Sequence, residues 1–136
     1  MRVILDTNVL LSALITREGV PGQIVDAWTA NAFVLLTHER QIEEIRRVTR
    51  RPRTRALLRA AEAGRLVNQL RDDAEFLGRL PATQRFADPA DDFLLAMCEA
   101  GGADYLVTGD KAGLLELGSH GATAIVTARR FLELIG

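Results

Sequence analysis

The strongest indication of the fold lies in residues 3–8, whose sequence is VILDTN. Three apolar residues end abruptly in Asp6, and two small polar residues, Thr7 and Asn8, follow it. A short apolar run of this kind is typical of a buried strand in a parallel sheet, with Asp6 at the carboxyl edge. Open α/β sheets bind their ligands at that edge. Asp6 is therefore a candidate functional residue, although the capping of a following helix would explain an aspartate here equally well.

Strand-like and helix-like segments alternate along the rest of the chain. Further strands are predicted at residues 33–37, 103–108 and 122–126. Helices are predicted at residues 8–14, 21–31, 38–49, 56–70, 72–80, 88–100 and 128–134, with a short one through Leu114 and Leu115. Residues 50–55 are predicted to be a charged break. The alternation implies an α/β fold with a central parallel sheet between layers of helices, and 136 residues suit a single domain over residues 1–136.

Composition excludes several classes of protein. A hydrophobic content of 48% and a net charge of -1 describe a globular chain rather than a disordered one. No apolar stretch reaches membrane-spanning length and no secretion signal is recognisable, so we expect a cytoplasmic protein. The single cysteine, Cys98, cannot form an internal disulfide, and we expect it in the core.

Two further aspartates are expected at the same sheet edge. Asp110 follows the strand predicted at residues 103–108, although a role in the turn would also explain it. Asp92 directly follows Asp91, which together with Asp88 we assign to capping of the helix that begins there. Asp92 has Ala96 four residues on, and a small residue on that side would let the helix approach the sheet.

A glutamate in the helix predicted at residues 38–49 is the fourth candidate. With Ile45 at the centre of the apolar stripe and about 100° per residue, Glu43 lies about 160° away and Glu44 about 100° away. Glu43 is therefore expected to face water and Glu44 to border the packed face. A solvated helix acid remains an alternative for Glu44.

Four carboxylates in one cleft would need a cation or protons. Two unit charges about 4 Å apart repel by about 4 kcal/mol at an effective dielectric constant of 20. Hard oxygen ligands without paired histidines or cysteines favour Mg²⁺ or Mn²⁺ over zinc. Such an ion suits cleavage of a phosphodiester by metal-activated water, which makes a metal-dependent nuclease the leading hypothesis.

The ordered motifs resemble those of the PIN-domain family of metal-dependent ribonucleases, and in particular the VapC-like toxins of bacterial toxin-antitoxin pairs. The resemblance implies a three-layer α/β/α sandwich, an RNA substrate, Mg²⁺ or Mn²⁺ as cofactor, a cognate antitoxin protein and a homodimer. It also implies a metal-binding and catalytic quartet with supporting polar groups. The quartet is Asp6, Glu44, Asp92 and Asp110, and the supporting groups are Thr7, Asn8 and Thr108.

Seven arginines fall between Arg46 and Arg59. Arg46, Arg50 and Arg53 are candidates for contact with RNA or with an antitoxin, since each phosphate contact would add salt-dependent affinity. A solvated, salt-bridged pair of helices would explain the cluster equally well. His38 and His120 have no partner at catalytic or metal-ligand spacing, so capping or surface roles are expected for both.

Two other functions are consistent with acids at a sheet edge. A receiver-like phosphoacceptor domain would need paired acids after the first strand, whereas Thr7 and Asn8 follow Asp6. A catalytically silent PIN-like module that binds RNA or protein is the non-enzymatic alternative, and the presence of all four acids argues against it.

Overall fold

The computed structural model describes residues 1–86, 88–109 and 112–136. Its strands are β1 (Arg2–Leu5), β2 (Val34–Thr37), β3 (Glu75–Phe76), β4 (Tyr105–Thr108), β5 (Ser119–His120) and β6 (Thr123–Thr127). Its helices are α1 (Thr7–Ile15), α2 (Val20–Thr29), α3 (Glu39–Thr49), α4 (Pro52–Arg55), α5 (Ala60–Asp73), α6 (Pro89–Gly101), α7 (Ala112–Leu117) and α8 (Ala128–Ile135). In the described part of the chain, no helix has the length and apolar character that crossing a membrane requires.

β1 lies at the centre of a mostly parallel sheet. The strand order is β3-β2-β1-β4-β6-β5, and β1 pairs in parallel with both β2 and β4. Val3, Ile4 and Leu5 are fully buried, as expected for a strand covered on both faces. The predicted α/β fold with a central parallel sheet is therefore confirmed.

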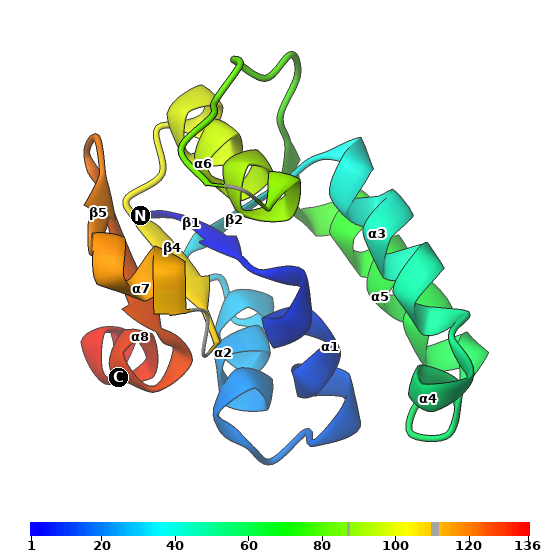
Figure 1. Cartoon of the computed structure of the whole chain (residues 1–136). Coiled ribbons are helices and arrows are strands. Elements are labelled where there is room, and N and C mark those ends of the chain that lie inside the picture. The colour runs from blue at the N-terminus through cyan, green and yellow to red at the C-terminus, as the bar shows by residue number, and fades with distance from the viewer. Residues whose placement is uncertain (87, 110–111) are drawn as a thin grey trace.

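Helices cover both faces of the sheet (Figure 1). Alternate residues of β1 point to opposite faces, so Val3 and Leu5 belong to one hydrophobic cluster and Ile4 to another. The first cluster contains side chains of α1, α2, α3, α5 and α8, and the second contains side chains of α6 and α7. The result is a three-layer α/β/α arrangement.

The strand order reverses direction between β1 and β4. The chain proceeds outward from β1 to β2 and β3, and it returns through α6 to β4 on the other side of β1. A backbone hydrogen bond of 2.9 Å from Asp6 N to Val107 O joins the carboxyl ends of β1 and β4. In open α/β sheets, ligands bind at the carboxyl edge beside such a reversal.

The prediction of a helix at residues 72–80 is wrong. α5 continues to Asp73, Ala74 turns to extended backbone, and β3 then pairs in parallel with β2. An ion pair between Arg2 and Glu75 and a 2.8 Å hydrogen bond from Leu77 N to Thr37 O hold this segment at the sheet edge. These partners lie far away in the sequence, so pairing with the sheet overrides a local helical pattern.

Two smaller predictions are also corrected, and one strand was missed. The predicted charged break contains the short helix α4, whose first residue is Pro52, a residue suited to a first helical turn. The helix predicted to start at Ala56 starts at Ala60 instead. β5 was not predicted, and its antiparallel pairing with β6 makes one edge of the sheet antiparallel. Gly121 lies in the turn between them with φ of 58°, a conformation that favours glycine.

Candidate functional site

Asp6 is a buried carboxylate at the junction of β1 and β4. Its side chain is 3% exposed and caps α1, with Oδ1 accepting a 3.4 Å hydrogen bond from Asn8 N. Oδ2 accepts a 3.0 Å hydrogen bond from the Thr108 hydroxyl at the end of β4. The capping role is therefore confirmed, and it leaves the carboxylate at the edge where the predicted metal site lies. Thr108, one of the three predicted supporting groups, thus contacts Asp6 directly, whereas Asn8 is exposed.

Gln41, which was not among the predicted site residues, connects α3 to the carboxyl ends of the central strands. It is 1% exposed, and its Nε2 donates to Leu5 O at 2.8 Å and to Thr7 Oγ1 at 3.4 Å. Its Oε1 accepts a 2.6 Å hydrogen bond from the Thr37 hydroxyl at the end of β2. Gln41 thus fixes where the first turns of α3 lie, and with them Glu44. A polar residue on the same helical stripe as Ile45 was the available signal.

Glu44 borders the packed face of α3, as the helical-wheel argument predicted, and Glu43 is exposed. The Glu44 side chain is 26% exposed, and its Oε2 lies 4.0 Å from a guanidinium nitrogen of Arg47. Both glutamates line a hollow of about 210 Å³ whose opposite wall is the first turn of α6 with Pro89.

Asp92 lies in the first turn of α6 and is held by the loop that precedes the helix. Its Oδ1 accepts hydrogen bonds from the backbone N–H groups of Arg85, at 2.8 Å, and Phe86, at 2.9 Å. These two bonds fix the orientation of the carboxylate. Ala96 is buried beneath it, at 5% exposure, as expected for a helix that packs closely.

The hollows beside Glu44 and Asp92 are neighbours. Asp92 lines a larger pocket of about 720 Å³, and both pockets share Arg40, Pro89 and Phe93. The Arg40 guanidinium carbon stacks 4.4 Å from the centroid of the Phe93 ring. α3 therefore presents Glu43 and Glu44, and α6 presents Asp92, to adjoining space, with the Arg40 guanidinium on the shared wall.

The fourth predicted acid, Asp110, lies outside the described residues, as does its neighbour Lys111. Within residues 1–86, 88–109 and 112–136, no three acid, histidine or cysteine side chains are placed so that they could hold one ion. The described donors are carboxylate and hydroxyl oxygens, which suit Mg²⁺ or Mn²⁺. The chemistry of the donor set fits such an ion, and the completeness of the quartet stays a prediction.

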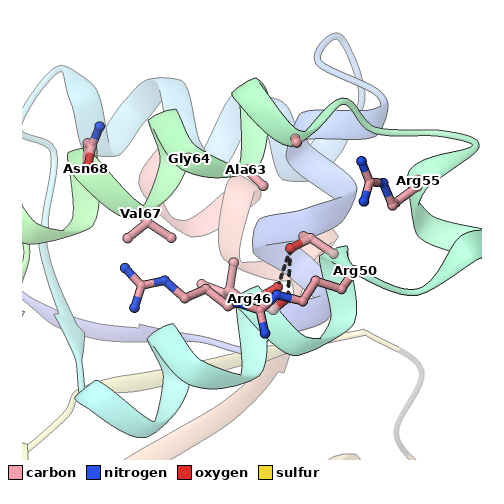
Figure 2. A pocket seen from close by; sticks show the side chains of 10 residues that line it. Arg46, Arg50, Arg55, Ala63, Gly64, Val67 and Asn68 are labelled. Atoms are coloured by element: carbon pink, nitrogen blue, oxygen red, sulfur yellow. Dashed lines mark hydrogen bonds between the residues drawn. The ribbon is translucent and has the colours of Figure 1, made fainter.

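Two of the three predicted arginine contacts line a separate pocket between α3 and α5 (Figure 2). Arg46 and Arg50 belong to its wall. Arg53 is exposed on α4 and is not among the lining residues, whereas Arg55, which was not predicted, is.

The two histidines and the cysteine have structural contacts. His38 caps α3 by accepting a 3.0 Å hydrogen bond from Arg40 N, as expected. His120 is partly buried, with its side chain 10% exposed, and its Nε2 lies 2.6 Å from Glu99 Oε1. Cys98 is buried in the core, as expected, and burial raises the pKa of its thiol to about 12.

The family of the chain follows from comparison with known proteins. A family model described as PIN domain matches residues 2–112, and the chain belongs to this family. PIN domains are typically nucleases that use divalent metals. Comparison with curated proteins and with solved structures gave no match. The match covers β1 through β4, including every predicted site residue from Asp6 to Asp110.

Proposed function

We propose that this protein is a Mg²⁺- or Mn²⁺-dependent endoribonuclease whose site lies at the carboxyl edge of β1 and β4. The observation that carries the proposal is the buried Asp6 carboxylate at the strand-order reversal, held by Thr108. Membership of a family of nucleases supports it. Asp6, Glu44, Asp92 and Asp110 are the residues that would hold the cation.

The residues of the proposed site would have distinct parts in the reaction. When bound, the cation would polarise the scissile phosphoryl oxygen and offset the charge that develops on it. Thr108 would keep Asp6 in one orientation, and the Arg85 and Phe86 amides would do the same for Asp92. A carboxylate of the quartet would accept the proton of the attacking water, which is ordinary general-base catalysis.

The finer biological role that we propose is the toxin of a toxin-antitoxin pair, with a cognate antitoxin protein and a homodimeric state. These proposals rest on the resemblance of the motifs to VapC-like toxins. Induced expression in bacteria should arrest growth for the wild type and should not do so for Asp6→Asn. Normal growth under wild-type expression would argue against the toxin role and would leave the nuclease proposal standing.

The nuclease proposal is tested by cleavage of single-stranded RNA with Mg²⁺, with Mn²⁺ and with EDTA. The wild type should cleave only with metal, and Asp6→Asn should lose activity because a neutral amide is a far weaker ligand than a carboxylate. Asp72→Asn, the same change on an exposed residue of α5, is the matched control and should cleave normally. Equal cleavage by wild type and Asp6→Asn, independent of metal, would reject the mechanism.

A further inference from the structure

A second pocket lies between α3 and α5, away from the proposed catalytic acids (Figure 2). Its volume is about 310 Å³, at the lower end of the range for ligand sites. The α3 and α4 side of the lining consists of Ile45, Arg46, Thr49, Arg50 and Arg55. The α5 side consists of Ala60, Ala63, Gly64, Val67 and Asn68.

The hollow exists because α5 presents small side chains there. Ala60, Ala63, Gly64 and Val67 follow the spacing i, i+3, i+4 and i+7, so they form one stripe along the helix. A methyl group added at Gly64 would meet no atom within 4 Å, so the space above this residue is open. Ile45 and Val67 are buried and give the pocket an apolar floor.

The wall of the pocket is strongly cationic. Arg46, Arg50 and Arg55 line it, and no acid is among its lining residues. None of the three is ion-paired with a carboxylate in the described part of the chain. The Thr49 hydroxyl bonds to the carbonyls of its own helix, at 2.8 and 3.2 Å, so guanidinium groups dominate the polar lining (Figure 2). This lining fits an anion.

The pocket and the catalytic acids lie on different sides of α3. Arg46 and Glu44 are two residues apart, so they point about 200° apart around the helix axis. A helix with its side chains is about 10–12 Å across. A ligand in the pocket is therefore not the group that reacts beside Glu44, and a polymer long enough to cross α3 could contact both places.

We propose that this pocket binds the phosphate backbone of single-stranded RNA at a position several nucleotides from the scissile bond. The inference rests on the proposed ribonuclease function, which supplies the RNA. Planar guanidinium groups match phosphate oxygens in paired hydrogen bonds, and the apolar floor of Ile45 and Val67 can pack against a base. An acidic peptide would supply carboxylates for the guanidinium groups, but it lacks the alternating phosphates and planar bases that match both the cationic wall and the apolar floor.

The test measures RNA affinity without catalysis. Binding of a fluorescent oligouridylate is followed by anisotropy in EDTA over a series of salt concentrations. Each lost phosphate contact lowers the slope of log K against log salt by about 0.7 for a single strand. The Arg46→Gln/Arg50→Gln double variant should therefore bind several-fold more weakly, with a slope shallower by about 1.4.

Two further variants separate the pocket from general charge. Arg129→Gln, exposed on α8, removes one positive charge outside the pocket and should keep the wild-type slope. Gly64→Leu fills the open space without changing charge and should weaken binding. Circular dichroism melting checks that each variant is folded.

The inference is overturned if the double variant and Gly64→Leu bind RNA as the wild type does, or if Arg129→Gln lowers the slope equally. The inference is also overturned, in favour of an acidic protein segment, if the double variant binds RNA as the wild type does but no longer binds polyglutamate. Failure of the proposed function looks different, because it is read from cleavage by Asp6→Asn, whereas this assay contains no metal.

Discussion

At the scale of single residues, Gln41 shows how a buried polar side chain can position a candidate site. Its amide satisfies Leu5 O and the Thr37 hydroxyl at once, in a place that water does not reach. Buried polar groups that lose a partner are costly, so this residue acts on stability as well as on position. Gln41 lies three residues before Glu44, so its hydrogen bonds also fix the position of Glu44 relative to the sheet edge.

Replacement of Gln41 by Leu should lower the free energy of unfolding by about 1–3 kcal/mol, since three buried polar groups, Leu5 O and the hydroxyls of Thr7 and Thr37, lose a partner. Urea unfolding measures the change. Gln23→Leu, at an exposed position of α2, is the matched control and should change stability by less than about 0.5 kcal/mol. An equally small effect at Gln41 would show that its hydrogen bonds do not hold α3.

Cys98 provides a prediction about pH. Because its folded pKa is raised by burial to about 12, from an ordinary value near 9, the native state keeps the thiol proton after the unfolded state has lost it. The contribution of Cys98 to stability is complete below pH 9 and is lost as pH rises toward 12. Cys98→Ala should reduce the fall in stability over this window, as measured by urea unfolding at several pH values. If the stability of Cys98→Ala falls as much as that of the wild type over this pH range, Cys98 is not the source of the fall.

At the scale of elements, the helical phase of α3 decides which glutamate can act. Glu44→Gln should lower metal-dependent cleavage by roughly 10–100-fold or more, the range for groups that support a metal site. Glu43→Gln makes the same chemical change on the exposed side and should cleave normally. A larger loss of cleavage for Glu43→Gln than for Glu44→Gln would show that Glu43, and not Glu44, belongs to the site.

α5 contains a glycine that the helix itself does not require. A Cβ at Gly64 would meet nothing within 4 Å, and glycine in a helix interior is about 1 kcal/mol less favourable than alanine. Gly64→Ala should therefore raise the free energy of unfolding by about 0.5–1 kcal/mol in a urea titration. A loss of stability would mean that α5 needs the close approach or flexibility of glycine at this position.

At the scale of the whole molecule, much of the fold was predictable because local patterns agree with the tertiary structure. The run before Asp6, the helical stripe containing Ile45 and the caps at His38 and Asp88 all lie where their patterns indicate. β3 was not predictable in this way, because its strand conformation depends on β2 and on Arg2, far away in the sequence.

Some features of the candidate site were likewise predictable from local sequence, and others were not. Asp6 at a strand end and Glu44 on the packed side of α3 follow from local patterns. The loop amides that hold Asp92, the Gln41 network and the role of Arg55 depend on contacts between distant segments, which residue spacing does not encode.

The central claim is that acids from separate elements share a divalent cation at the carboxyl edge of β1 and β4, and direct Mn²⁺ binding tests it. Isothermal titration calorimetry should show that wild-type protein and Asp72→Asn bind Mn²⁺ alike, while Asp6→Asn loses most of the affinity. Absence of Mn²⁺ binding by the wild type, or binding by Asp6→Asn as tight as that of the wild type, would contradict the claim.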